Sequence, residues 1–445
     1  MANPRPDESV EVALLDELAD GWLAGIREQG WQDVQIYCGI DAEIRVRMAG
    51  DRVTTETSFQ RRGAFVLATR NGRTELCSAN LAEADRAFAQ LFGFSGRTRN
   101  PVGQPGQPSA VAERARELAA EQVGEANNVC PAPASMQTLL DVRRRAFAVR
   151  DSHGIRASAV DGGARWRAEI RDGFGNVAGI GRAYSRQAHR ALRAEAVAAA
   201  YRQSIEWNGF VVAGLRTTPV VFGPAAAASC LHELIGHARE ADNVARVAGY
   251  LADCADELVT SPALSMWDDP TFADSFGGYR LDDEGIPAER TPILTGGRVA
   301  GALESTRTAR TRNVAPNGHG RRSDYRYPAL PRASTVVLDR GTVATEQLLE
   351  GLEVLHIRDI VSGDVHPVTG AFRLTAGEAY WVVGDTMRAV RDVTIFGQAR
   401  QALGQIEAVA NDYGVDNVLC AKAGQFIGIG LASPSVRFGA LQWMS

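Results

Sequence analysis

The sequence predicts an α+β protein of two domains, and three observations lead to this fold class. The chain has 445 residues, 45% of them hydrophobic and 23% charged, which is an ordinary globular composition and enough length for two or three domains. Helix-like and strand-like patterns are mixed without the regular βαβ alternation of a doubly wound sheet. Near residue 210 the pattern changes to short strands separated by Gly, Pro and Asp. We therefore expect an N-terminal α+β domain over residues 1–210 and a strand-rich C-terminal domain over residues 211–445.

The N-terminal half predicts helices packed around a small antiparallel sheet. Residues 10–29 carry apolar side chains at helical spacing, and Gly30 stands where a C-terminal cap belongs. Asn71 and Gly72 form a dipeptide typical of a tight hairpin turn. The expected helices are residues 10–29, 81–92, 110–125, 135–142 and 186–204, the expected strands are 34–38, 43–58, 63–77, 146–149, 155–160 and 165–172, and a loop is expected over 97–108.

In the C-terminal half, one helical stretch over residues 229–243 interrupts the short strands. It contains the motif on which the functional interpretation depends. Further expected elements are helices at residues 346–353 and 397–412 and a strand-turn-strand at 372–383.

Charge, apolar stretches and cysteine content indicate the compartment and the kinds of partner to expect. Asp and Glu outnumber Lys and Arg by 53 to 48, which argues against a general nucleic-acid-binding surface. The longest apolar stretch, residues 219–231, contains Gly223 and Pro224 and is shorter than the ~20 residues of a spanning helix. The first residues lack a signal-peptide pattern, and the six cysteines form no C-x-x-C pair. We expect a cytoplasmic protein with free thiols and no membrane or nucleic-acid partner.

The distinctive motif is His-Glu-Leu-Ile-Gly-His at residues 232–237. It is one residue longer than the H-E-x-x-H of zinc peptidases. On a regular α-helix, residues five apart are offset by ~140°, so His232 and His237 could not reach one metal. A single π-type turn would return both to one face, and Gly236 would ease the distortion. The alternative interpretation is a buried helix with two core histidines and no metal.

A metal site would require a third ligand elsewhere in the chain. Catalytic zinc generally has three protein ligands and an open position for water. The spacing does not rank the downstream candidates, which are His319, His356, His366, Cys254 and Cys420.

Five sequence blocks are spread across most of the C-terminal half. They are residues 232–237 followed by Glu240 and Asp242, then 281–291, 316–322, 375–380 and 419–425. In order and spacing these blocks resemble the TldD/PmbA family of metallopeptidases, and specifically its TldD-type catalytic subunit. The N-terminal half resembles the family only in its general alternation of helices and a small sheet.

The resemblance implies a two-domain TldD-like fold in which His232, His237 and Cys420 bind Zn²⁺ and residues 211–445 form the metallopeptidase domain. Zinc suits two imidazoles and a thiolate best, with iron or cobalt as alternatives. Ala421 and Ala423 stand where the family has a glycine and an acidic residue. The resemblance also implies a heterodimer with a TldE/PmbA-like subunit, which typically lacks the histidine motif. A homodimer is the alternative.

Several neighbouring side chains are candidates for supporting roles. Glu233 is the natural general base, since it directly follows the first histidine. Glu240 could accept a hydrogen bond from a histidine ligand or lie on the helix surface. His319 in its Gly-rich loop, together with Arg321 and Arg322, could contact substrate, or these residues could form a turn and ordinary ion pairs.

The function expected from these residues is zinc-dependent hydrolysis of amide bonds in unfolded or precursor peptides. The resemblance implies an enclosed site, which would exclude folded proteins. Two alternatives stay open: a non-proteolytic binding or assembly protein, and a biosynthetic hydrolase of a small amide metabolite. The intact set of His, Glu and Cys favours catalysis.

Overall fold

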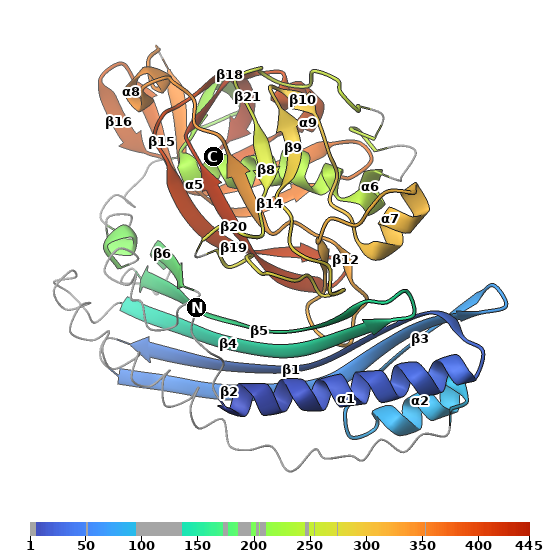
Figure 1. Ribbon diagram of the computed structural model, residues 1–445. Helices are drawn as coiled ribbons and strands as arrows, with labels where there is room; N and C mark the ends of the chain where they lie inside the picture. The colour runs from blue at the N-terminus through green and yellow to red at the C-terminus, as the bar shows by residue number, and fades with distance from the viewer. Residues whose placement is uncertain are drawn as a thin grey trace.

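A long, curved antiparallel sheet forms the N-terminal half of the molecule (Figure 1). The computed structural model describes residues 6–49, 52–94, 136–171, 177–185, 197–201, 204, 211–244, 249–252, 254–273, 275–351 and 353–445. The six strands lie in the order β3-β2-β1-β4-β5-β6. They are β1 (Gln32–Ala49), β2 (Arg52–Arg70), β3 (Arg73–Asn80), β4 (Met136–Asp151), β5 (Arg156–Arg171) and β6 (Val177–Ser185).

Two helices cover one face of this sheet, α1 (Pro6–Glu28) and α2 (Ala84–Phe92). Leu15, Trp22 and Ile26 recur at helical spacing and therefore lie on one face of α1. This face is buried against the apolar residues of β1. The expected helices over residues 10–29 and 81–92 are therefore confirmed. The Asn71 and Gly72 turn is confirmed as well, since both residues have positive φ (54° and 75°), as a hairpin of this kind requires.

The opposite face of the sheet packs against the C-terminal half. Tyr37, Phe65 and Phe147 form a buried aromatic cluster with Leu281 and Tyr325. An ion pair of 2.8 Å between Arg145 and Asp283 crosses the same contact. The sheet therefore forms a wall beneath the C-terminal half.

Two further sheets enclose one helix in the C-terminal half. One has the order β10-β9-β8-β13-β20-β19, the other contains β14-β7-β21-β17-β15-β16 with β18 beside β21, and β11 and β12 form a short pair. Helix α5 (Pro224–Leu231) contacts both larger sheets and is apolar on most sides, as a central helix must be. The strands are β7 (Arg216–Phe222), β8 (Met266–Asp268), β9 (Thr291–Thr295), β10 (Arg298–Val299), β11 (Gly320–Arg321), β12 (Leu330–Pro331), β13 (Thr335–Leu338), β14 (Val354–Val365), β15 (Ala371–Val383), β16 (Thr386–Ala389), β17 (Thr394–Gln398), β18 (Ile406–Val409), β19 (Gly414–Lys422), β20 (Gln425–Ser433) and β21 (Val436–Met444). The short helices are α6 (Ala241–Val244), α7 (Thr306–Arg312), α8 (Thr345–Leu348) and α9 (Ala399–Leu403).

Several expected elements were wrong. Residues 136–142 belong to β4 instead of a helix, because β4 pairs along its length with β1 and β5. Residues 372–383 lie in the single strand β15, and 397–412 contain only the short α9 followed by β18. The helix expected over 346–353 is confined to α8. The helix expected over 186–204 is not among the errors, because the residues described in this range, 197–201 and 204, are helical. The expected helix 110–125 and loop 97–108 lie outside the described residues.

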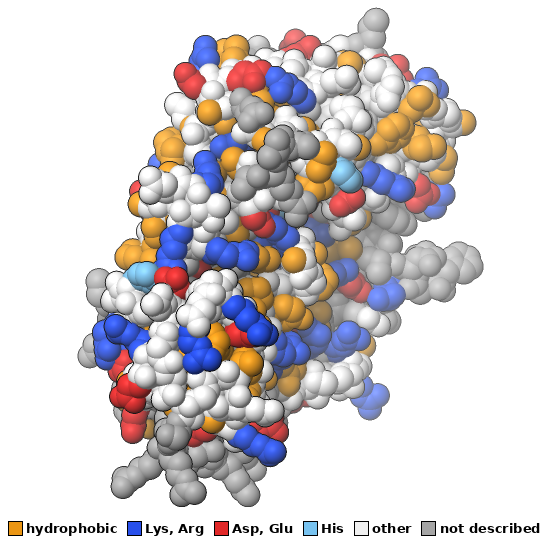
Figure 2. All heavy atoms as spheres, turned by 90° about the vertical axis from the view of Figure 1, so that its right-hand side faces the viewer, with side chains coloured by type: hydrophobic (Ala, Val, Ile, Leu, Met, Phe, Trp, Pro, Cys, Tyr) orange, Lys and Arg blue, Asp and Glu red, His pale blue; other side chains and the backbone are white. Residues whose placement is uncertain are grey.

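The α+β fold class is confirmed, whereas the division at residue 210 stays a prediction. Among the described residues, no helix has both the length and the apolar character needed to cross a membrane. The face shown in Figure 2 carries Lys and Arg interspersed with Asp and Glu.

Candidate active site

The H-E-x-x-x-H motif lies where α5 changes its helical period. Residues His232–Gly236 form one π-helical turn, in which the His237 N–H donates to the His232 carbonyl five residues earlier. A short 3₁₀ turn, His237–Arg239, follows. The expected π-type turn is therefore confirmed, and it brings the two imidazole rings to a centroid distance of 4.4 Å.

Gly236 permits this close arrangement. A Cβ atom at residue 236 would approach Nδ1 of His232 to 3.1 Å, which is tighter than most Cβ contacts. The glycine therefore leaves room for the imidazole of His232, which is only 3% exposed.

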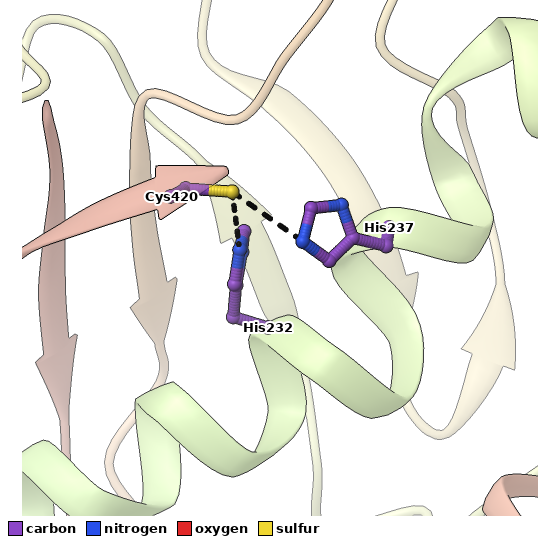
Figure 3. Close-up of side chains that lie close together, drawn as sticks. All are labelled: His232, His237 and Cys420. Carbon is purple, nitrogen blue, oxygen red and sulfur yellow. Dashed lines mark hydrogen bonds between the residues drawn. The ribbon is translucent and has the colours of Figure 1, made fainter. Parts of the chain in front are cut away.

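Cys420 completes a three-residue cluster near the end of β19 (Figure 3). Its Sγ lies 3.3 Å from Nε2 of His232 and 3.4 Å from Nε2 of His237. Among the described residues, this is the group of metal-binding side chains whose donor atoms all lie within 4.8 Å of one another. The other candidates for the third ligand, His319, His356, His366 and Cys254, are not part of it.

Electrostatics favour the deprotonated thiol. Burial alone would raise the pKa of Cys420, but the two neighbouring imidazoles hold it well below its usual range. Burial opposes the charged form of His237, yet Glu240 and Cys420 raise its pKa well above the ordinary value. These shifts describe a thiolate beside a protonated His237, which would release its proton on metal binding and leave a thiolate and two imidazoles, the donors that zinc prefers.

Glu240 lies behind His237. Its Oε2 is 3.0 Å from Nδ1 of His237 and accepts a hydrogen bond of 2.8 Å from Nζ of Lys422. Burial would raise the pKa of Glu240, but Lys422 and then His237 lower it, so the carboxylate stays charged although it is fully buried. A carboxylate on the outer nitrogen fixes the ring orientation of a histidine ligand.

Glu233 faces the cluster from the first turn of the motif. Its Oε2 lies 3.9 Å from Nε2 of His237, and the side chain is 14% exposed. Burial raises the pKa of Glu233, while His237 and His232 partly oppose this shift. A Cβ at Gly363 of β14 would come within 2.6 Å of Cγ of Glu233, so this glycine is needed for the carboxylate to occupy its position.

A cavity of about 810 Å³ opens in front of these residues. The C-terminal half lines it with His232, Glu233, His237, Cys420 and residues 360–365 of β14. The N-terminal sheet closes the other side with Leu139, Arg165, Trp166, Arg167 and Arg182. The sequence offered no direct signal for this second wall, because contacts between the halves are long-range.

The remaining candidate residues lie away from the cavity lining. His319 is fully buried, with Nε2 3.0 Å from Oδ1 of Asp268. Arg321 donates to the backbone carbonyls of Ala333 and Gly428. Arg322 lies between the rings of Tyr37 and Phe65, with its guanidinium carbon 4.4 and 4.8 Å from their centroids. These side chains hold the loop 316–322 against β20 and the N-terminal sheet.

Two sequence features acquire a structural explanation here. Lys422, the single lysine of the chain, links Glu240 to Asp242 at 2.8 and 2.7 Å. Ala423, which departs from the family pattern, has φ +50° in the turn between β19 and β20. The conformation of this turn is therefore strained for an L-residue.

Comparison with known proteins adds independent information. Residues 215–444, slightly more than half of the chain, match the sequence family described as the PmbA/TldA metallopeptidase C-terminal domain. A metalloprotease TldD homolog of Buchnera aphidicola is 28% identical over 229 residues, which cover 51% of this chain and 47% of that protein. A metalloprotease of Synechocystis is 29% identical over 300 residues, covering 66% and 60%. The chain thus spans about half the length of the curated relatives it matches.

Two crystal structures have the same fold over nearly their whole length. One is described as a candidate modulator of a DNA gyrase from Thermotoga maritima, with TM-score 0.75, 20% identity and coverage of 96% of this chain and 99% of that chain. The other is TldE from Thermococcus kodakarensis, with TM-score 0.73, 16% identity and the same coverage. At these identities the likeness concerns the fold.

Proposed function

Since the chain belongs to the TldD/PmbA family of metallopeptidases, we propose that it is a zinc-dependent peptidase acting on unfolded or precursor peptides. The observation that carries this proposal is the convergence of His232, His237 and Cys420 beside Glu233 at the cavity. Neither histidine lies close to Cys420 in sequence, so only the fold brings this donor set together.

The three donors fit a zinc ion. Tetrahedral bonds of about 2.0–2.3 Å would separate neighbouring nitrogen and sulfur donors by roughly 3.6 Å. The separations of 3.3 and 3.4 Å between Sγ of Cys420 and the two imidazoles are close to this value. We assign His232, His237 and Cys420 as the ligands, with Glu240 orienting His237. Zinc bound there would supply Lewis-acid polarisation of the scissile carbonyl.

Glu233 is the proposed general acid and base. Its carboxylate lines the cavity, and burial raises its pKa above the ordinary value, the direction that helps a carboxyl act as a general acid. It would take a proton from the attacking water and later deliver this proton to the leaving amine. This sequence of transfers leaves the carboxylate regenerated after each turnover.

The edge of β14 suits an extended substrate. Residues 354–365 pair with β15 on one side, whereas β7 pairs only with 355–357 on the other. Residues 361–364 are exposed and line the cavity next to Glu233, and no strand of the described residues pairs with their second edge. A peptide in extended conformation could add there through main-chain hydrogen bonds. We therefore propose unfolded chains as substrates and expect folded, disulfide-bonded proteins to resist cleavage.

We further propose that this chain is the catalytic subunit of a heterodimer with a TldE/PmbA-like partner. The histidine motif supports the catalytic role, and the fold shared with TldE supports an assembly of two similar chains. Sedimentation of the protein alone and with a TldE-like subunit would distinguish the heterodimer from a homodimer.

The decisive experiment measures metal content and peptide cleavage together. Elemental analysis of tag-free protein should give about one zinc per chain, lost in Cys420→Ser and His237→Ala while the fold persists. Cys254→Ser is the matched control, because Cys254 is also buried but lies outside the cluster. A metal content that is unchanged in Cys420→Ser and His237→Ala would contradict the zinc site. A panel of unstructured peptides and small amides then separates the peptidase from the biosynthetic hydrolase, and turnover of neither would favour the binding-protein alternative.

A further inference from the structure

The arginines and the acidic side chains that line the cavity lie on opposite walls, and Lys422 on the acidic wall is paired with Glu240 and Asp242. The N-terminal sheet contributes Arg165, Arg167 and Arg182. The acidic lining residues Glu233, Asp242 and Asp364 all come from the C-terminal half, on the side of the proposed zinc ligands. A substrate in the cavity therefore has the three arginines on one side and Glu233 with the proposed zinc ligands on the other.

The three arginines differ in how fully their charge is compensated. Arg182 is paired with two carboxylates, Asp359 at 2.7 Å and Asp416 at 3.5 Å. Arg165 donates twice to Asp141, from Nε at 3.2 Å and from a terminal nitrogen at 2.6 Å. Both side chains are about four-fifths buried, so their guanidinium groups are held by the protein itself.

Arg167 is the most exposed of the three, because the side chains of Arg165 and Arg182 are only 22% and 19% exposed. In the described part of the chain its one ion-pair partner is Glu169 at 2.8 Å, which is shared with Arg171 at the same distance. The Arg167 side chain is 43% exposed, yet its Nε is buried and has no hydrogen-bond acceptor among the described residues. Because Nε is buried, only the exposed part of this planar guanidinium is open to a carboxylate from the cavity.

The register of the sheet adds a second observation. Arg167 of β5 stands directly opposite Arg182 of β6. Like charges in directly opposed positions of a sheet are destabilising. Asp359 and Asp416 offset this repulsion at Arg182, and both arginines line the cavity.

We propose that Arg167 binds a carboxylate of the substrate and selects peptides with an acidic group at the position facing the N-terminal sheet. This inference rests on the proposed peptidase function and adds a specificity determinant to it. The carboxylate comes either from an Asp or Glu side chain or from the C-terminus of the peptide. Asp359 and Asp416 compensate the charge of Arg182, so Arg167 is the residue of this pair that is left to contact the substrate.

The test uses two series of unstructured ten-residue peptides. In the first, one Glu is moved along a neutral sequence and compared at each position with Gln. In the second, the free C-terminal acid is compared with the amide. Binding is measured by fluorescence anisotropy in the Glu233→Gln background, and kcat and KM are measured in the protein with an intact Glu233.

The expected result is tighter binding, by about tenfold or more, of one acidic peptide over its neutral counterpart, which corresponds to one charge-assisted contact. Arg167→Gln should abolish this preference by raising KM for the acidic peptide, with kcat and the neutral peptide little changed. Arg167→Glu should shift the preference to a Lys-containing peptide. Preference for Glu at an internal position identifies a side-chain carboxylate, and preference for the free acid over the amide identifies a C-terminus.

Arg171→Gln is the matched control, because Arg171 shares Glu169 with Arg167 but does not line the cavity. The Arg171→Gln variant should leave the preference for the acidic peptide unchanged. Equal binding of acidic and neutral peptides at every position, or equal losses in Arg167→Gln and Arg171→Gln, would overturn the inference while the peptidase function could stand. Binding that discriminates by charge through Arg167, without cleavage of any peptide, would support the inference and count against the proposed peptidase function.

Discussion

Lys422 donates a hydrogen bond of 2.8 Å to Oε2 of Glu240, the same oxygen that lies 3.0 Å from Nδ1 of His237. The carboxylate is fully buried and also lies 3.7 Å from Arg332. A cation at the end of β19 thus supports the acid that orients a proposed zinc ligand, two positions beyond Cys420.

Glu240→Gln should weaken metal binding about 10- to 100-fold, the usual effect of losing a partner behind a histidine ligand. The amide can still accept a hydrogen bond, but it no longer carries the charge that favours the imidazole orientation. Competition with a chromophoric chelator measures the affinity. Retention of the wild-type affinity would show that Glu240 serves only the packing of this region.

Lys422→Met should lower the free energy of unfolding by about 3–5 kcal/mol, because it leaves a buried carboxylate without its closest cation. Urea unfolding of metal-free protein measures this loss separately from zinc binding. The double variant Glu240→Gln/Lys422→Met should recover part of it, since the uncompensated charge is then absent. Additive losses in the double variant would mean that the two side chains are not energetically coupled.

Glu233→Gln should keep the metal content and reduce kcat about 10²- to 10⁴-fold, the range for loss of a general base. The substitution changes no proposed ligand and preserves the side-chain volume beside Gly363. Single-turnover cleavage of an unstructured peptide, with zinc analysis of the same sample, is the measurement. Wild-type turnover in this variant would remove Glu233 from the mechanism.

Ala423→Gly should stabilise the protein by about 1 kcal/mol. The φ of +50° at Ala423 costs an L-residue ~1–2 kcal/mol, which glycine avoids at a smaller cost in unfolded-state entropy. Ala421→Gly is the control, because Ala421 lies within β19, where glycine should destabilise. The urea midpoints of the two variants should therefore move in opposite directions.

His356 should make stability depend on pH between about 6.5 and 4. Burial, with a smaller effect of Arg358, lowers the pKa of His356 to about 4 in the folded protein. The unfolded chain has a His pKa near 6.5 and binds a proton that the folded state excludes, so stability falls as pH decreases through this window. The loss is about 2–3 kcal/mol at pH 4 and should be absent in His356→Gln. Urea unfolding at pH 7 and pH 4.5, with EDTA present throughout, compares the two proteins.

The π-helical turn could be predicted because it follows from geometry within six residues. Two histidines five positions apart share a face only if the helix widens locally, and Gly236 marked the place. The identity of the third donor could not be predicted from local geometry. Spacing left five candidates open, and only the resemblance selected Cys420, since its approach depends on the hairpin of β19 and β20 docking on the helix.

The errors in the fold have a similar cause. Met136 and Leu140 are four residues apart, which suits a helix, yet Leu140 and Val142 also suit a strand. Pairing with β1 and β5 decided for the strand, and such partners are distant in sequence. The arginines of the cavity wall were missed for the same reason, because Arg165 and Arg167 show only strand alternation until the sheet is placed against the proposed zinc ligands.

His237 and Cys420 are separated by 183 residues, and this distance sets an order of events during synthesis. Ribosomes add about 5–20 residues per second, so the thiol follows the second imidazole by roughly 9–37 s. A growing chain that has released only the central helix holds His232 and His237 but lacks the thiol of Cys420. The proposed metal site can therefore form only late, after nearly the whole C-terminal half has been translated and the hairpin has closed on the helix.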